Sequence, residues 1–336
     1  MRLAEKFLRS SLRCIPYCRV GFIASLSLFI HPLLDAQSQR SAAVLAQDGW
    51  KAFEEGHFGE AKQSLDEAVR LAPTVADYHA ALAQVDLKTG DADGAIRHFR
   101  RAIQLKPLDA ESRLNLAELL QTENKDTEAL QILQVAHPSF DLSDAWHFSR
   151  GFSMFRIGRF APASEEFKTT LHNSRFKASA SFFLGNIAYS QDNFEKAEPY
   201  LATAVELGNV EDNKAYNAYT YDYGLVLFKL GKFSDAEQQF KASIAHYEND
   251  PLPWMFLGRC EEELGNFSTA IQMLETSIKI DPEFPLSYYE LARLQQRHGN
   301  PQRAAELFEK IGTMKADEVQ NEEKRAMKLR TGTRPQ

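Results

Sequence analysis

The chain has 336 residues, of which 44% are hydrophobic and 25% are charged. This composition is that of an ordinary folded protein, and it excludes a disordered, collagen-like or disulfide-stapled chain. The net charge of −7 gives no electrostatic footprint for a nucleic-acid partner.

The first 36 residues have the pattern of an export signal. Residues 1–19 hold five basic residues against one acid, and residues 20–30 form a short apolar run. Ala36 then places a small residue before Gln37. This order predicts a secretory signal peptide over residues 1–36 and a short linker at 37–41. We therefore expect an exported chain, in a periplasmic or extracellular location.

Two alternatives for this segment stay open. The first is an uncleaved membrane anchor through residues 20–34, although the apolar run is shorter than the roughly 20 residues that span a bilayer. The second, in a eukaryotic source, is an Arg-rich organellar transit peptide. Contact with a membrane is expected only if the segment is not cleaved.

An alanine recurs at a fixed interval along the rest of the chain. Twelve residues before each such alanine stands Gly or Ala, five before it stands Gly, Asn or Asp, and four after it stands Leu or Phe. The anchors, whose numbers differ by 34 at every step except one step of 39, are Ala61, Ala95, Ala129, Ala163, Ala197, Ala236, Ala270 and Ala304. The small residues before them are Gly49, Ala83, Ala117, Gly151, Gly185, Gly224, Gly258 and Ala292.

Each of these columns has a physical reason in a pair of antiparallel helices. Gly, Asn or Asp five residues before the anchor tolerates the left-handed conformation that ends the first helix. The small residues let the two helices approach closely, and the Leu or Phe begins the apolar stripe of the second helix. Pro73, Pro107 and Pro282 fall where the second helix must end. Five aromatic residues in the turn are expected to plug the open end of the pair: Phe58, Phe160, Phe194, Phe233 and Phe267.

The pattern resembles the tetratricopeptide repeat, whose signature runs W-x2-L-G-x2-Y, then A-x3-F, A and P over about 34 residues. The seventh repeat matches it best, with Trp254, Leu257-Gly258, Ala270, Leu274 and Pro282. The resemblance implies an all-α fold, an α-solenoid in which helix-turn-helix repeats form a right-handed superhelix. Eight such repeats cover residues 42–318.

Two segments depart from the regular interval. Five extra residues enter within 208–214, between the fifth and sixth repeats; we expect a longer loop, with a change of superhelix pitch or a binding loop as the alternative. Residues 315–330 are helix-prone and strongly charged, which predicts a C-terminal capping helix, with an interaction helix as the alternative. Residues 331–336 are expected to form a flexible tail.

The sequence contains no recognisable catalytic motif. Its nine histidines are scattered without metal-ligand spacing, and no HExxH, paired-cysteine, phosphate-binding or G-x-S-x-G pattern occurs. We therefore expect no enzyme, no cofactor, no metal site and no small-molecule substrate. Cys260 is the one cysteine outside the export segment, and we expect it to be a small packing residue.

The resemblance implies a concave groove that is lined by the first helix of each repeat. Carried over to this sequence, the fourth to sixth repeats give an aromatic stripe, and the seventh and eighth give a basic and polar end. The predicted groove residues are Phe148, Phe152, Phe155, Phe182, Asn186, Tyr189, Tyr221, Leu225, Phe228, Lys229, Arg259, Arg293 and Arg297. We expect partial exposure of Phe152 and Tyr221. Phe155, Tyr189 and Phe228 are expected either to lie exposed or to be half-buried between neighbouring first helices.

Aromatic anchors in such a groove suit an extended peptide or an amphipathic helix. The resemblance therefore implies a non-catalytic adaptor that binds a protein or peptide segment. The alternative is a scaffold subunit of a cell-envelope assembly or export complex, with its contacts on the convex face or the ends. The Lys and Asn residues by which some chaperone-binding members of the family hold a terminal carboxylate are not reproduced, because Asn115 and Asn186 are isolated.

Overall fold

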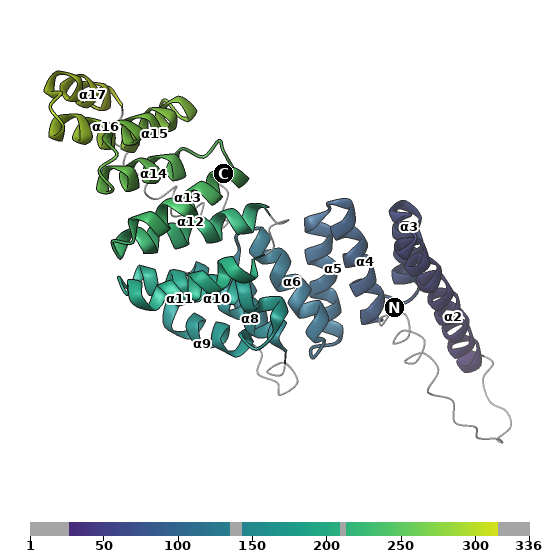
Figure 1. Cartoon of the computed structure of the whole chain (residues 1–336). Coiled ribbons are helices and arrows are strands. Elements are labelled where there is room, and N and C mark those ends of the chain that lie inside the picture. The colour runs from purple at the N-terminus through teal and green to yellow at the C-terminus, as the bar shows by residue number, and fades with distance from the viewer. Residues whose placement is uncertain (1–26, 135–142, 209–212, 315–336) are drawn as a thin grey trace. The chain divides into compact units, whose positions relative to one another are not determined.

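The computed structural model describes residues 27–134, 143–208 and 213–314. These residues form sixteen α-helices and no strand (Figure 1). The first helices of the repeats are α2 (Ser27–Glu54), α4 (Ala76–Thr89), α6 (Ala110–Thr122), α8 (Asp144–Arg156), α10 (Ser174–Ser190), α12 (Asn213–Lys229), α14 (Pro251–Glu263) and α16 (Pro285–Arg297). The second helices are α3 (Phe58–Leu71), α5 (Ala92–Leu105), α7 (Asp126–Leu133), α9 (Phe160–Thr170), α11 (Phe194–Leu207), α13 (Phe233–His246), α15 (Phe267–Ile280) and α17 (Pro301–Thr313).

The chain divides into two compact units, residues 1–90 and 91–336. The first unit contains α2, α3 and α4, and a core of alanines and leucines joins them. In the second unit, from α6 onward, each first helix packs on the second helix that follows it and on the next first helix, as in the series α6, α8, α10, α12, α14 and α16. Figure 1 shows α10 and α11 as one such pair, side by side. The predicted all-α architecture of paired helices is confirmed.

The residue five positions before each anchor alanine, where the first helix ends, has the expected left-handed backbone in all eight repeats. Six members are glycines with φ between 72° and 90°, and the other two are Asn124 at 59° and Asp192 at 55°. The prolines also act as expected, because α3, α5 and α15 each end two residues before Pro73, Pro107 and Pro282.

This geometry predicts the effect of adding a side chain at Gly231. Gly231 has a φ of 72°, in the left-handed region of backbone conformation. That conformation costs a residue with a Cβ about 1–2 kcal/mol. We expect Gly231→Ala to lower the free energy of unfolding by about 1 kcal/mol in urea denaturation. The matched control is Asp192→Gly. Asp192 has the same left-handed conformation, so removal of its Cβ should leave the free energy of unfolding unchanged or raise it slightly. Equal effects of the two substitutions on stability would contradict the left-handed conformation of these helix ends.

The small-residue column lies where the two helices of a pair are closest. A Cβ built on Gly185 would lie 2.5 Å from Leu201 Cγ, and one on Gly258 would lie 2.8 Å from Leu274 Cγ. Both leucines belong to the Leu/Phe column, sixteen residues after the glycine. In the five repeats whose small residue is glycine, the Leu or Phe of the second helix therefore fills the notch that the glycine leaves in the first helix.

Part of the predicted N-terminal segment lies within the described residues. Residues 37–41, expected to be a linker, are helical and belong to α2, while residues 1–26 lie outside the described part of the chain. Among the described residues no helix is long and apolar enough to cross a membrane. The predicted cleavage position after Ala36 falls within α2, and Gly49 lies in the part of α2 that follows it.

The five extra residues between the anchors Ala197 and Ala236 are mainly helical. The helix α12 begins at Asn213, eleven residues before Gly224, whereas α14 begins at Pro251, seven residues before Gly258. Since α11 and α15 both end ten residues after their anchor alanines, most of the inserted length, relative to the seventh and eighth repeats, is additional helix at the start of α12, in place of the longer loop that the sequence favours. Residues 209–212 and the predicted C-terminal segments 315–330 and 331–336 lie outside the described residues.

Cys260 is fully buried in the core of the second unit, as expected for a packing residue. Burial, more than the neighbouring carboxylates, raises the pKa of its thiol to about 12. The reactive thiolate is therefore almost absent at neutral pH. We expect iodoacetamide at pH 8 to leave Cys260 unmodified in a folded Cys14→Ser, Cys18→Ser variant and to modify it fully in guanidinium chloride. Rapid modification of the folded chain would contradict this.

Candidate functional site

Three of the thirteen predicted groove residues are buried. Phe182 is 5% exposed, Tyr221 6% and Leu225 3%, so the expected partial exposure of Tyr221 is wrong. The cause is cover from the next repeat. The Phe182 ring on α10 lies 4.8 Å from the Tyr219 ring on α12, and the Tyr221 ring lies 6.0 Å from Phe256 on α14.

The other ten predicted residues are half-buried or exposed on the first helices of the second unit, and we call their surface the first-helix face. They are Phe148, Phe152, Phe155, Asn186, Tyr189, Phe228, Lys229, Arg259, Arg293 and Arg297. Because α8, α10, α12, α14 and α16 contact one another in succession, these residues belong to one continuous row of helices.

The three phenylalanines of α8 are half-buried, and they share one ring partner on α10. The rings of Phe148, Phe152 and Phe155 lie 6.0, 5.4 and 5.1 Å from the ring of Phe183. Phe183 in turn stacks on Phe167 of α9, with 5.0 Å between centroids and 13° between planes. Phe183 therefore ties the fourth repeat to the fifth and fixes three side chains of the first-helix face.

The aromatic residues near the ends of the first helices pack on the turn aromatics. Phe155 contacts Phe160 at 5.6 Å, Tyr189 contacts Phe194 at 5.5 Å and Phe228 contacts Phe233 at 5.3 Å, each pair five residues apart. All three are half-buried, and Phe155 and Phe228 also contact the next first helix, at 5.1 Å from Phe183 and 6.0 Å from Phe256.

The turn aromatic of the seventh repeat behaves differently. Phe267 is 40% exposed, and its ring lies 3.6 Å from that of His298. The expected plug is therefore absent in this turn.

The arginines of the seventh and eighth repeats do not form an open basic patch. Arg293 and Arg297 both pair with Glu262, which is only 8% exposed, and Arg297 Nη1 lies 3.2 Å from Glu262 Oε1. Glu290 lies between Arg293, at 2.9 Å, and Arg259, at 3.7 Å. Three arginines and two glutamates thus alternate across α14 and α16, and most of the positive charge is neutralised.

Arg259 also links this charged network to the aromatic stripe. Its guanidinium lies 4.6 Å from the centre of the Phe228 ring and 5.4 Å from that of Phe256. A guanidinium above a ring face gains from the negative charge of that face. The first-helix face therefore changes from aromatic to paired charges at Arg259.

Buried polar contacts hold α6 and α8 in register. Gln121 Nε2 donates to Ser149 Oγ at 2.9 Å and to Ser153 Oγ at 2.7 Å. Arg156 donates to the carbonyl of Gln121 at 2.8 Å. Its Nε lies 3.1 Å from Asp126 Oδ2, and the two side chains are only 7% and 8% exposed. Buried groups that are paired in this way are costly to break.

The Asp126 carboxyl predicts a dependence of stability on pH. Burial raises its pKa above the ordinary value of 3.8, and the opposing attraction of Arg156 is smaller. An acid with a raised folded pKa contributes stability below its ordinary pKa and loses it as pH rises through the folded value. We expect the natural chain to lose more stability than Asp126→Asn as pH rises from 3.8 upward, measured by urea denaturation. If the free energy of unfolding of the two proteins changed with pH in the same way, a raised pKa of Asp126 would be contradicted.

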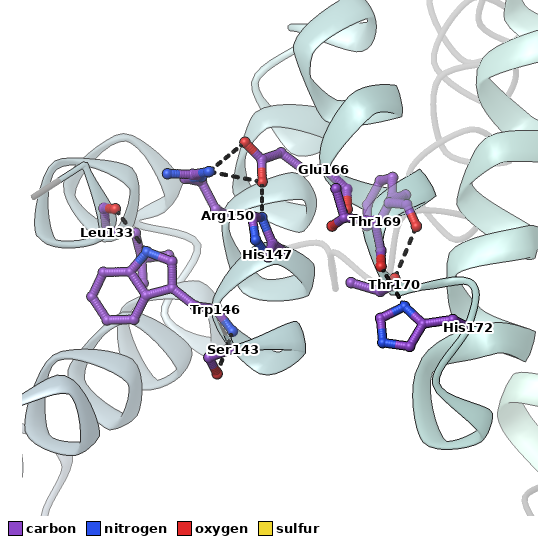
Figure 2. Close-up of polar contacts among 10 residues, drawn as sticks. Leu133, Ser143, Trp146, His147, Arg150, Glu166, Thr169, Thr170 and His172 are labelled. Carbon is purple, nitrogen blue, oxygen red and sulfur yellow. Dashed lines mark hydrogen bonds and ion pairs between the residues drawn. The ribbon is translucent and has the colours of Figure 1, made fainter. Parts of the chain in front are cut away.

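A polar cluster between α8 and α9 is the nearest approach to a catalytic constellation (Figure 2). His147 Nδ1 lies 2.7 Å from Glu166 Oε2, and Arg150 Nη2 lies 2.8 Å from Glu166 Oε1. Figure 2 also shows Trp146 pointing away from this cluster, where its Nε1 donates to the Leu133 carbonyl. All three side chains are at most 20% exposed, so the cluster joins the two helices of the fourth repeat.

The described residues offer no obvious site for a metal. No three His, Cys, Asp or Glu side chains within the described ranges come together as a ligand set. A pocket of about 190 Å³ lies among α9, α10 and α11, lined in part by Phe160, Leu184, Lys168 and Tyr200. None of the predicted groove residues lines this pocket, which lies beside the second helices.

Sequence reasoning missed Phe183 and Glu290, which contact groove residues, and Asp126, which pairs with Arg156 beside them. A signal for Phe183 was present, because it stands sixteen residues after Phe167, and Phe256 stands sixteen after Phe240. The second pair repeats the stacking of the first, with 5.5 Å between centroids and 19° between planes. No comparable spacing marks Glu290 or Asp126.

Two family profiles, both described as tetratricopeptide repeat, match the chain. One matches residues 49–107, 153–213 and 221–285, together more than half of the chain. The other matches residues 86–147 and 262–321. A search of the sequence against curated proteins gives no match.

Solved structures with a similar fold include proteins described as tetratricopeptide repeat proteins. A tetratricopeptide repeat protein from Parabacteroides merdae has a TM-score of 0.52 at 16% identity, over 76% of this chain and 98% of that one. The Cut9-Hcn1 hetero-tetramer of the APC/C gives 0.54 at 17% identity, over 87% of this chain and 58% of that one. YrrB, described as having an unusual peptide-binding site, gives 0.48 at 24% identity, over 56% and 95%.

Proposed function

The chain belongs to the tetratricopeptide repeat family, and from this premise we propose that it is a non-catalytic adaptor that binds a protein segment on its first-helix face. Repeats of this family support a protein-binding adaptor or scaffold, and no enzyme family is indicated. The partner is a protein or peptide, and the proposal includes no nucleic acid and no small-molecule substrate.

The observation that carries the proposal is the continuous row of first helices with incompletely buried aromatic side chains. Packed helices lie about 8–10 Å apart. An extended peptide advances about 3.3 Å per residue, so a segment crossing the row meets a new helix about every three residues. Phe152 on α8, Tyr189 on α10 and Phe228 on α12 then contact successive apolar side chains of one ligand.

The charged network at the other end of the row determines the direction in which a bound segment lies. Arg259, Arg293 and Arg297 are held in place by two glutamates, so their remaining donors point in fixed directions at little further entropic cost. A segment that is apolar at one end and carries acceptors at the other therefore fits the face in one direction.

Charge reversal at exposed positions of the face tests this proposal. We expect Lys229→Glu with Arg297→Glu to abolish crosslinking of the partner in the native host. The matched control is Lys168→Glu with Lys241→Glu, two exposed lysines on second helices that pair with glutamates, as Arg297 does. Loss of the partner in the control pair alone would instead favour the scaffold alternative, with contacts on the second-helix side.

Export of the chain is part of the proposal. It rests on the basic, then apolar, then small-residue order of residues 1–36, and it places the adaptor in the periplasm or outside the cell. The test is the intact mass of the chain purified from its native host. A mass beginning at Gln37 supports export with cleavage, a full-length chain in the membrane fraction supports the anchor through residues 20–34, and a full-length chain outside that fraction overturns both.

A further inference from the structure

The helix α5 carries positive charge that stands out from the rest of the chain. Residues 92–106 hold one acid against four bases, a net charge of +3. Because the whole chain has a net charge of −7, the remainder has −10. The four bases, all of them exposed, are Arg97, Arg100, Arg101 and Lys106.

The three arginines share one side of the helix. Arg100 and Arg101 follow Arg97 by three and four residues, the spacing at which helical side chains are neighbours. Phe99 and Ala102 lie on the opposite side and are fully buried. The surface formed by Arg97, Arg100 and Arg101 therefore points away from the core, and we call it the α5 basic face.

The fold neutralises only one of these three arginines. Arg100 pairs with Glu128 of α7. Arg101 Nη1 lies 3.3 Å from the amide oxygen of Gln104, which carries no charge. Within the described ranges, no carboxylate oxygen lies within 4.0 Å of the guanidinium nitrogens of Arg97 or Arg101. These two guanidinium groups therefore have donors available for a carboxylate from outside the chain.

Other exposed arginines of the second helices have a counter-charge on their own helix. Arg70 pairs with Glu67 and Arg303 with Glu306, each three residues away. In α5 the corresponding neighbours are positive, because Arg97 and Arg101 stand one turn apart. Like charges at this spacing destabilise a helix. The helix thus keeps a repulsion that a bound anionic group would remove.

We propose that the α5 basic face binds an acidic protein segment, with Arg97 and Arg101 each holding one of its carboxylates. A guanidinium binds a carboxylate through two parallel N–H···O bonds, which a lysine cannot provide. The site lies on a second helix and is separate from the first-helix face. It therefore stands independently of the adaptor function proposed above.

The spacing of the two arginines fits an extended segment. Four helical residues advance about 6 Å. Alternate residues of an extended chain lie about 6.6 Å apart and point to the same side. A segment with Asp or Glu at every second position therefore presents consecutive carboxylates to Arg97 and Arg101.

The charge of the surrounding chain favours a narrow ligand. A membrane or a nucleic-acid duplex presents negative charge over a wide area, so it would also meet the remainder of the chain, whose net charge is −10. A single acidic segment follows one helix and avoids that repulsion.

Binding of a synthetic acidic peptide to the full-length chain tests the site. A fluorescently labelled peptide of alternating Glu and Ser is titrated and its anisotropy is followed. We expect Arg97→Glu with Arg101→Glu to weaken binding about tenfold or more. The matched control, Lys168→Glu with Lys241→Glu, makes the same charge change on other second helices and should weaken it less than about twofold. Absence of binding to the natural chain, or equal weakening by the two pairs, overturns the proposal.

A second comparison separates this site from the first-helix face and from a membrane. Lys229→Glu with Arg297→Glu should leave peptide binding unchanged, and a loss there overturns the α5 site without bearing on the adaptor. Phosphatidylserine vesicles in place of the peptide should not bind. Vesicle binding that Arg97→Glu with Arg101→Glu removes, without peptide binding, also overturns the proposal.

A stability measurement distinguishes a binding role from a structural one. We expect Arg97→Gln with Arg101→Gln to weaken peptide binding while the urea midpoint stays unchanged or rises, because the repulsion between the two arginines is gone. A lowered urea midpoint would show that the arginines support the fold, and it would overturn the proposal.

Discussion

Replacing Gly185 by valine is expected to lower the free energy of unfolding by about 3 kcal/mol. Gly185 is the point of closest approach between α10 and α11, where a Cβ would lie 2.5 Å from Leu201 Cγ and 2.8 Å from Leu201 Cδ2. Leu201 is fully buried and cannot move aside without shifting the helix. The gain in helix propensity over glycine, at most about 1 kcal/mol, does not offset this clash.

The location of Gly185 in an interior repeat adds a second observable effect. In a repeat array stability is a sum of repeat and interface terms, so a weak fifth repeat uncouples its neighbours. We expect a single urea transition, followed by circular dichroism, to broaden or split in Gly185→Val. The matched control is Gly312→Val on α17, where a Cβ meets nothing within 4 Å and stability should change by less than about 0.5 kcal/mol. Equal losses would show that close packing is not the cause.

Truncation of Phe183 to alanine is expected to cost about 3 kcal/mol or more. Its ring contacts Phe148, Phe152, Phe155, Phe167 and Phe182, so the substitution removes contacts between α8, α9 and α10 at once. It should also release the three α8 rings of the first-helix face and weaken partner binding, measured by titration of the purified partner.

Phe267→Ala is the matched control for this truncation. Phe267 is 40% exposed and contacts a single described ring, that of His298. Its loss should cost about 1 kcal/mol or less and should leave partner binding unchanged. A cost at Phe183 no larger than that at Phe267 would contradict its role as the link between the fourth and fifth repeats.

The repeat architecture could be predicted from the sequence because each recurring residue type meets a local requirement of backbone conformation or helix packing. Left-handed helix ends need Gly, Asn or Asp, and the closest approach of two helices needs Gly or Ala, whatever lies further away. The inserted residues could not be placed in the same way, because an extended helix α12 and a longer loop satisfy the same interval.

The candidate site was predicted less well, because burial on the first helices depends on the next repeat. Leu225 and Phe152 each stand one residue after the glycine of their own first helix, yet Leu225 is buried in a core shared with the seventh repeat, while Phe152 is left half-buried. The arginines are neutralised by a similar long-range effect. Arg293 and Glu262 are 31 residues apart, and no local pattern shows that they pair.

The central claim is that the partner lies on the first-helix face, and site-specific photocrosslinking in the native host tests it most directly. A benzophenone side chain is placed at Phe152, Lys229 or Arg293 on the face, and at Lys168 or Lys241 on the second helices. The account predicts that the three face positions crosslink one common protein and that the two second-helix positions do not. Crosslinking of that protein from Lys168 and Lys241, with none from the face, would contradict it.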